Sequence, residues 1–511
     1  MKRPVIMILC AFLLGVFGAV FSIGPAFALA GAVIVVKCWL ADKRQALSMA
    51  VLVSVAATGW VLIWLDLETV TYWKELESIH KQQAFQIHGT VLSRTHTTGY
   101  RTTYSLRADT ICGDGWAAKD PGKVILRVHD RQGITQVFSP GTGLLIQSPE
   151  IQQVLTGMED PAYLRSWHRN GFKAVLQVSS DDVAEIKLRH PLRKTAYVIR
   201  QKSEAVIGAL LPEDENRLLK SLFFGQRQYL DGDTLDVFSR TGTAHITAVS
   251  GLHTGILAMT VQWVLVFLGL VKRHARLAAV LLVWFYAAMA GFPVSVVRAA
   301  SMVTIYALSF PLGRRYDAKS SLLWCALLFL ALTPSSLWSV SFQLSFAATA
   351  AILWVFPLLN RMELGNGLWF PGKELLWITT AVQVGVWPIL AWHFGSVSLI
   401  SILVNPLIIP ILGILLPAAM AMVVVGTISI QAAVPLSLIV QGGLRCLWLI
   451  PRWFAKWPMA AISIETIHPM WVVGYYGILI YCVWRAERRK STCKELIPTP
   501  REEKKEASDN E

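Results

Sequence analysis

Long apolar stretches recur along the chain and constrain its fold more than any other feature. Of the 511 residues, 54% are apolar and only 16% are charged. A helix needs roughly 20 mostly apolar residues to cross the hydrocarbon core of a bilayer, and about 11–13 stretches approach that length, most of them after residue 240. The sequence therefore predicts a polytopic α-helical membrane protein with about 11–13 spans.

The first of these stretches lie within residues 1–66, which read as closely spaced transmembrane helices. Lys2 and Arg3 precede the first, and Lys43 and Arg44 precede the third, so the positive-inside rule puts both basic segments in the cytoplasm. A secretory signal with a cleavage site near Ala28-Leu29-Ala30 is the alternative. We expect a multi-pass protein of the bacterial inner (plasma) membrane, in contact with membrane lipid.

Residues 67–190 form the larger polar segment and follow the third expected span, which places them outside the cytoplasm. Apolar and β-branched residues alternate in several short runs separated by Gly, Asp and Pro, as in short strands. The runs are Phe85–Val91, Thr103–Ala108, Lys123–Val128, Gly143–Gln147 and Phe172–Val178. Such a pattern predicts a small extracytoplasmic β-barrel domain like an OB-fold.

OB-folds bind single strands through basic grooves and stacking aromatics, and several side chains of this segment have that chemistry. The candidates are Arg94, Arg101, Tyr104, Arg107 and Arg127. Acidic residues nearly balance the basic ones here, so a purely structural domain remains the alternative. The net charge of +14 for the whole chain does not decide the matter, because basic residues also accumulate in the cytoplasmic loops of membrane proteins.

The rest of the chain divides into three parts. Residues 191–240 have apolar positions at helical spacing and predict amphipathic interfacial helices. Residues 241–485 hold most of the apolar stretches and predict a transmembrane domain, with a Pro-broken segment near 397–409. Residues 486–511 are rich in Lys, Glu and Ser, and we expect a disordered cytoplasmic tail.

Polar residues inside the transmembrane domain are the candidates for function. In the run from His245 to His253, hydroxyl residues recur at steps of three and four from Thr243 through Thr247 and Ser250 to Thr254, and would share one helical face. Such a face either lines a pore or lets helices pack closely. The two histidines lack metal-ligand spacing, and we predict neither a metal nor a cofactor.

Further polar groups follow downstream. Arg298 lies a few residues into an apolar stretch, where a charged group must face partners, water or a polyanion, or reach the interface. Alternating Ser339, Ser341, Gln343 and Ser345 suggest an extended or broken segment. Gln383 before Pro388, and Asn405 before Pro406, indicate kinked or interrupted helices, which occur where a substrate passes or as ordinary kinks.

No nucleotide-binding loop, nucleophile elbow or metalloprotease helix motif occurs in the sequence. We therefore expect no catalytic residues, and transport driven by another protein. Two alternatives to a nucleic-acid channel remain: a transporter of another anionic solute, and a membrane enzyme using His245 and His253 as acid and base.

Several ordered motifs carry a family resemblance. They are FSRTGTAHITAVSGLH at 238–253, PVSVVRAASM at 293–302, GRRYD at 313–317, SFQLSFAATA at 341–350, the run from 382 to 410, and DPAYLRSWHRNGFKAV at 160–175. Together they resemble the ComEC competence family over residues 1–485. The resemblance implies an inner-membrane channel through which single-stranded DNA enters during natural transformation.

The same resemblance implies partners: an outer DNA receptor and a cytoplasmic helicase-like ATPase. Many members of that family also carry a C-terminal metallo-β-lactamase-like domain thought to degrade the strand that does not enter. Here residues 486–511 hold no such cluster of ligands, so we expect a separate nuclease.

Overall fold

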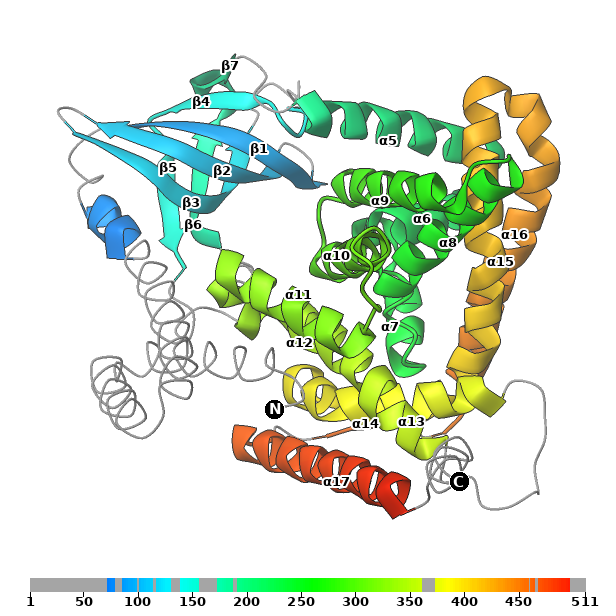
Figure 1. The fold of residues 1–511 in the computed structure, drawn as a ribbon. Helices are drawn as coiled ribbons and strands as arrows, with labels where there is room; N and C mark the ends of the chain where they lie inside the picture. The colour runs from blue at the N-terminus through cyan, green and yellow to red at the C-terminus, as the bar shows by residue number, and fades with distance from the viewer. Residues whose placement is uncertain are drawn as a thin grey trace, which may run out of the picture. The chain divides into compact units, whose positions relative to one another are not determined.

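The computed structural model describes residues 71–78, 85–98, 101–113, 116–129, 138–155, 172–186, 191–360, 373–458, 460–464 and 467–496 (Figure 1). The expected N-terminal spans and the end of the tail lie outside these residues. The chain divides into two compact units. Unit 1 comprises Met1–Gly232, His245–Gln343 and Ile411–Cys446, and unit 2 comprises Asp233–Ala244, Leu344–Pro410 and Leu447–Glu511.

Seven strands form one sheet in unit 1. The strands are β1 (Phe85–Thr98), β2 (Arg101–Gly113), β3 (Trp116–His129), β4 (Gly143–Gln147), β5 (Glu150–Val154), β6 (Phe172–Ser179) and β7 (Val183–Ile186). Their order is β5-β6-β3-β2-β1-β4-β7. The neighbours β1, β2 and β3 are antiparallel, whereas β3 and β6 run parallel. A parallel pair needs a long connection, which the chain between His129 and Phe172 provides.

All the strands expected from alternation are confirmed, and β5 and β7 are additional. The expectation of a closed barrel is not confirmed, because the ladder is open and ends at β5 and β7. The chain turns sharply between β4 and β5, where Ser148 has a positive φ of 45°. This turn lets β4 pair with β1 while β5, only a few residues later, pairs with β6.

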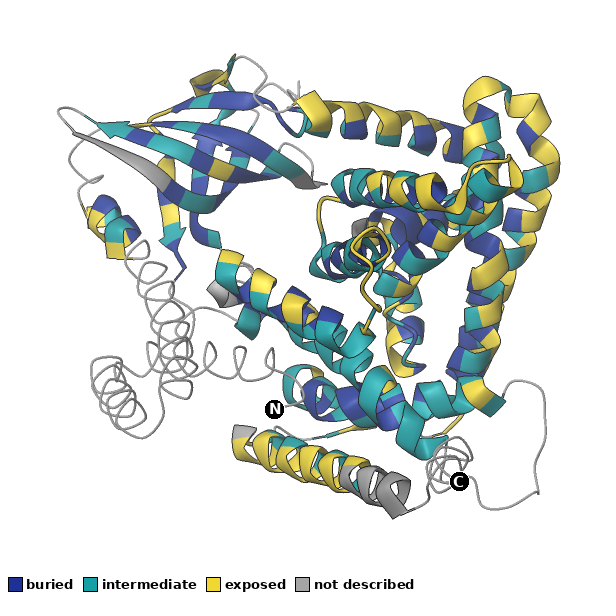
Figure 2. Ribbon diagram, in the orientation of Figure 1, coloured by how far each residue is buried: buried dark blue, intermediate teal, exposed yellow. Residues whose placement is uncertain are grey.

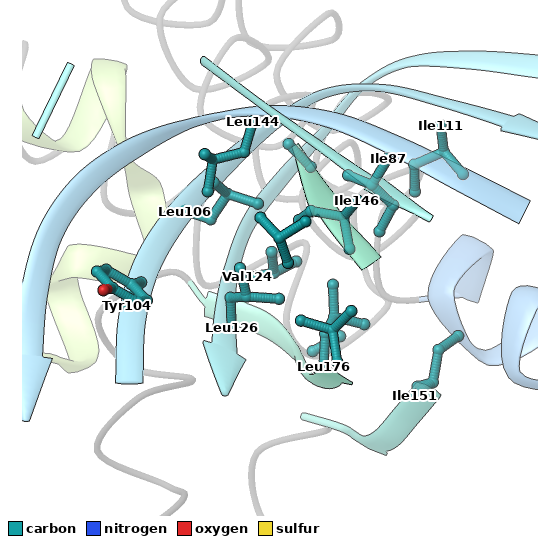
Figure 3. Packing of buried hydrophobic residues seen from close by; sticks show 14 of the residues in the cluster. Ile87, Tyr104, Leu106, Ile111, Val124, Leu126, Leu144, Ile146, Ile151 and Leu176 are labelled. Carbon is teal, nitrogen blue, oxygen red and sulfur yellow. The ribbon is translucent and has the colours of Figure 1, made fainter. Parts of the chain in front are cut away.

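One face of the sheet carries the core of this domain, and the side chains of β1 to β6 converge on it in Figure 3. Ile87, Leu106 and Ile146 are fully buried there. A helical stretch over 71–78 contributes Trp73, whose indole Nε1 donates to the carbonyl of Pro121 at 2.8 Å. Burial of side chains of this size stabilises a fold by about 1.5–3 kcal/mol each.

Amphipathic helices α5 (Pro191–Leu210) and α6 (Glu213–Phe224) follow, as the sequence predicts. α6 begins with three acidic residues, which suit the positive end of a helix, and ends at Gly225 in the left-handed conformation. Its Leu218, Leu219 and Leu222 are buried. A third short helix, α7 (Gly232–Arg240), lies mostly in unit 2.

The apolar part of unit 1 contains α8 (Gly251–Phe267), α9 (Lys272–Met289), α10 (Val294–Ser309) and α11 (Ala318–Leu332). The first three pack against one another, and α10 also contacts α11. α12 (Val340–Ala350) begins in unit 1 and ends in unit 2. It continues in unit 2 as a π-helical turn over Ala351–Val355 into α13 (Phe356–Leu359), and α14 (Lys373–Phe394) follows. Three more helices follow: α15 (Ser401–Ile428), α16 (Ile430–Phe454) and α17 (Pro469–Leu496).

Four helices among the described residues are long and apolar enough to cross a membrane: Val340–Leu359, α14, α15 and α16. The helices α8, α10 and α11 are apolar but shorter. The long helices α15 and α16 carry many exposed positions (Figure 2). Large apolar side chains are among them, for example Ile414 of α15 and Leu438 of α16. Such exposure suits lipid, and this is a membrane protein.

Three local expectations about the transmembrane domain are wrong. Residues 241–250 form turns rather than a helix, so Thr243, Thr247, Ser250 and Thr254 do not share one helical face. The run from Val340 to Ser345 is helical and not extended. The segment near 397–409 is not broken by its prolines, because α15 begins at Ser401 and runs through Pro406 and Pro410. α17 also extends to Leu496, beyond the expected end of the span at residue 485.

Pro388 lies inside α14 and removes one helical hydrogen bond, because proline has no N–H to donate to the carbonyl of Val384. Tyr475 of α17 replaces that donor, with its hydroxyl 2.9 Å from the Val384 carbonyl oxygen. Tyr476 donates to the next carbonyl, that of Gly385, at 2.7 Å. Tyr475 thus satisfies the carbonyl that the proline leaves open, as a segment in lipid requires.

Replacing Tyr475 by Phe should therefore destabilise the protein by about 1 kcal/mol, because the Val384 carbonyl loses its donor. Replacing Pro388 by Ala restores a backbone N–H, so the cost of Tyr475→Phe should shrink in that background. Thermal unfolding of the four variants in detergent measures this coupling. Equal costs in both backgrounds would show that the tyrosine does not compensate for the proline.

Candidate functional site

The first polar cluster lies in unit 1, where the turn segment ending at Ser250 enters α8. Ser250 caps the helix: its Oγ accepts from the backbone N–H of His253 at 3.4 Å, and the His253 Nδ1 accepts from the Ser250 N–H at 3.3 Å. This is a capping box in which histidine takes the place of the usual Glu or Gln. In the sequence, a Ser three residues before a His at the start of an apolar run could have indicated that a helix begins there.

Side chains from neighbouring helices hold the turn segment itself. Ser221 of α6 donates to the carbonyl of Thr247 at 2.6 Å, and Ser295 of α10 donates to the carbonyl of Val249 at 2.7 Å. Carbonyls outside regular secondary structure need such donors when water is excluded. Thr247 is fully buried, whereas His245 is exposed.

Arg298 of α10 brings a positive charge to this cluster. Its guanidinium lies directly against Gly251, the first residue of α8, and a Cβ at that position would overlap Nη2. Only 8% of Arg298 is exposed. The absence of a side chain at Gly251 lets this buried cation approach the N-terminus of a helix.

This contact joins two electropositive groups. The N-terminus of a helix carries a partial positive charge of about half an elementary charge, and the guanidinium carries a full one. Each favours an anion nearby, and their proximity adds the two effects. An arginine also presents a planar fork of donors that suits phosphate oxygens.

The second polar cluster lies in unit 2 and contains Gln383. Its Nε2 donates to Oγ of Ser401, which in turn donates to the carbonyl of Ser398 at 2.9 Å. The chain returns after α14 through β8 (Ser396–Ser398), which pairs with β9 (Ala461–Ser463), and thereby places Ser401 against a residue 18 positions earlier. Asn405 follows one turn later on α15 and is 7% exposed.

Gly242 completes the second cluster. It has a φ of 68°, and a Cβ there would lie 2.5 Å from the Cβ of Ser401 and 3.0 Å from that of Ser398. The hydroxyls of Thr241 and Thr243 on either side are hydrogen-bonded to each other at 2.8 Å. Ser398, Ser401 and Gly242 were not among the candidates from the sequence. The Thr-Gly-Thr run that contains Gly242 was the only sequence pattern that pointed to this cluster.

The remaining candidates of the transmembrane domain lie elsewhere on α12. Gln343 donates through Nε2 to the carbonyl of Leu337 at 3.0 Å, at the start of its own helix. The carbonyl of Ser345 accepts from the hydroxyl of Thr349 at 3.0 Å. Within the described part of the chain, no group of three or more His, Cys, Asp or Glu side chains is placed to hold a metal ion.

In the β domain, the candidate DNA-contact residues lie on two opposite faces of the sheet. Arg101 is opposite His129, Thr103 opposite Arg127, and Arg107 opposite Lys123 in the β2–β3 ladder, so these basic residues share one face. Burial lowers the pKa of Lys123, and the charges of Arg107 and Arg193 lower it further. Arg127 donates to the amide of Gln152 at 2.7 Å.

Tyr104 is the candidate that the structure contradicts. It lies on the opposite face, is fully buried in the core, and its hydroxyl accepts from the backbone N–H of Phe138 at 3.3 Å. It therefore cannot stack on an incoming base. The alternation of the strand could have shown this burial, because position 104 is an odd number of residues from 101 and 107. Its side chain therefore lies on the other face of the sheet. The backbone of Arg94 pairs with Tyr104, and its side chain lies outside the described residues.

A known protein family matches the part of the chain that contains these clusters. The family described as "Competence protein" matches residues 222–489, which include both clusters and parts of both units. The chain belongs to the competence protein family. No solved structure matches it.

Curated relatives each match less than half of the chain. ComE operon protein 3 of Bacillus subtilis is 28% identical over 232 residues, which cover 45% of this chain and 29% of the relative. Recombination protein 2 of Haemophilus influenzae is 30% identical over 214 residues, covering 39% and 27%. Competence protein ComA of Neisseria gonorrhoeae is 29% identical over 215 residues, covering 38% and 28%. The chain thus spans less than a third of each of these relatives.

The contact between Gly251 and Arg298 yields a prediction about stability. Gly251→Ala should destabilise the protein by about 1–3 kcal/mol, because the added methyl displaces the guanidinium. The matched control is Gly255→Ala, one turn later on α8, where a Cβ meets nothing within 4 Å. Unfolding in detergent, repeated in an Arg298→Ala background, should show the cost of Gly251→Ala reduced. Equal stabilities of the Gly251 and Gly255 variants would contradict this packing.

Proposed function

We propose that this competence family member is an inner-membrane channel that carries a single strand of DNA into a bacterial cell during natural transformation. Support comes from its family, from relatives named for competence and recombination, and from the long apolar helices. A strand of DNA carries one negative charge per nucleotide, so its path through a membrane must offer positive charge and polar groups.

The observation that supports this proposal most is the buried Arg298 against the N-terminus of α8. A guanidinium and a helix N-terminus both attract phosphate oxygens, and here they lie together. The hydroxyls of Ser250 and Ser295 lie on the elements that meet there. Because phosphates are identical along a strand, this site would favour passage without favouring any sequence.

The β domain would meet DNA before the channel does. We propose that it is an OB-like domain on the outer side of the membrane, and that its basic face with Arg101, Arg107 and Arg127 contacts the backbone of the strand. Arg94 remains a candidate for the same role. Tyr104 has no part in it, because it is a core residue.

Other proteins would supply the remaining steps. We propose that an outer receptor delivers the DNA, a cytoplasmic helicase-like ATPase drives its movement, and a separate nuclease degrades the other strand. The proposal assigns no catalytic step to this chain. His253 serves as the capping partner of Ser250, which gives it a structural role in place of the acid–base role considered from the sequence.

Uptake of labelled transforming DNA tests the proposal, in cells of the native species that lack this protein and are complemented at matched membrane abundance. Wild type should restore uptake, and Arg298→Gln should reduce it at least about tenfold, corresponding to about 1.4 kcal/mol. Arg298→Lys should recover part of the loss, because it keeps the charge without the planar fork.

The control is Arg217→Gln, which removes an arginine that pairs with Glu213 of its own helix and whose side chain is 44% exposed. It should transport normally. Unchanged DNA uptake in cells without the protein would refute the proposal. If those cells instead lose uptake of a small anion, the protein is a transporter of an anionic solute.

A further inference from the structure

The Gln383 cluster contains buried polar atoms for which the described part of the chain provides no hydrogen-bond partner. Gln383 is 6% exposed and Asn405 is 7% exposed. Among the described residues, neither Oε1 of Gln383 nor Oδ1 of Asn405 has a partner, and the same holds for the buried Nε1 of Trp387. Each such group costs about 1–3 kcal/mol if nothing satisfies it.

These atoms belong to one region of unit 2. Gln383 and Trp387 are four residues apart and share a face of α14, while Ser401 and Asn405 are four apart and share a face of α15. The hydrogen bond from Gln383 to Ser401 joins the two faces. Trp387 and Asn405 therefore each lie one helical turn from that contact.

The backbone of α15 adds acceptors to the same region. Pro406 and Pro410 have no N–H, so the carbonyls of Ile402 and Pro406 lose their usual helical donors. The prolines thus leave the first two turns of α15 richer in acceptors than an ordinary helix.

The chemistry of the region is neutral. The sequence from Leu375 to Ile428 contains no Lys, Arg, Asp or Glu. Neither a phosphate nor a metal ion would find a counter-charge on these helices. A fitting ligand is uncharged, offers both donors and acceptors, and presents a flat ring to an indole.

Nucleobases meet these requirements. Asparagine and glutamine amides hydrogen-bond base edges, and tryptophan rings and donors recur in single-strand recognition. We infer that Gln383, Trp387 and Asn405 form a site for the bases of the transported strand, an inference that rests on the proposed function. Because an amide offers a donor and an acceptor, the site accepts every base and selects none.

This site complements Arg298 in chemistry. Arg298 attracts the backbone, which is charged and identical at each nucleotide, whereas the amide site interacts with the bases, which are neutral. The two effects can therefore be separated by removing the bases from a strand while keeping its phosphates.

Binding of fluorescent oligonucleotides to the purified full chain in detergent tests the inference. One oligonucleotide has ordinary bases, and the other is an abasic strand of equal length and charge. Wild type should bind the base-bearing strand at least about tenfold more tightly, a difference of about 1.4 kcal/mol. The double variant Gln383→Leu/Asn405→Leu should lose this difference and keep its affinity for the abasic strand.

The matched control is Thr379→Val, one turn before Gln383 on α14. The Thr379 hydroxyl already donates to the carbonyl of Leu375 at 2.7 Å, so it has no donor left for a ligand. This variant should retain the preference for bases. A strand carrying 5-iodouracil gives a measurement on unmodified protein, since irradiation should cross-link it to the α14 peptide that contains Trp387.

The outcomes separate the two proposals. Equal binding of both strands by wild type, together with no cross-link at α14, would overturn the base site and leave the DNA channel intact. A double variant that keeps the preference would show that these amides bind only structural water. Failure of wild type to bind either strand would refute the channel proposal, and the base site with it.

Discussion

Hydrogen bonding of the backbone within an apolar environment is the constraint on which the described structure depends. A bilayer offers no water to a free carbonyl or N–H, so each irregularity in a helix needs a compensating side chain. In unit 2 the Val384 carbonyl, which Pro388 leaves without its helical donor, accepts from Tyr475. In unit 1 the turn before α8 is held by Ser221 and Ser295. Irregular backbone thus persists where neighbouring helices supply donors.

The irregular positions also gather the polar chemistry of the protein. The turn before α8 ends at the helix N-terminus that Arg298 contacts, and the prolines of α15 follow the contact between Gln383 and Ser401. Glycine makes both clusters sterically possible, since a side chain at Gly251 or Gly242 would overlap its neighbours. The two clusters differ in character, because one is cationic and the other neutral. That difference matches the two chemical parts of a DNA strand.

The β domain illustrates how one pattern yields both a correct and an incorrect prediction. Alternation located the strands well, since it depends only on one face being buried. It also fixed which residues share a face, and Tyr104 belongs with Leu106 and not with Arg107. The prediction that the aromatic ring of Tyr104 stacks on bases ignored this alternation of faces. The edge strands β5 and β7 were not recognised, and β7 has only four residues.

The sequence by itself determined the membrane class, the strand segments, most helices and the family, because these follow from apolar length, local periodicity and ordered motifs. It also singled out Arg298, Gln383 and Asn405, since polar groups stand out in apolar stretches. Only the tertiary structure decided how they are used. The turn at 241–250 depends on donors from distant residues, as for Thr247 and Ser221. The pairing of Gln383 with Ser401, and of Arg298 with Gly251, depends on how helices meet, which local periodicity does not encode.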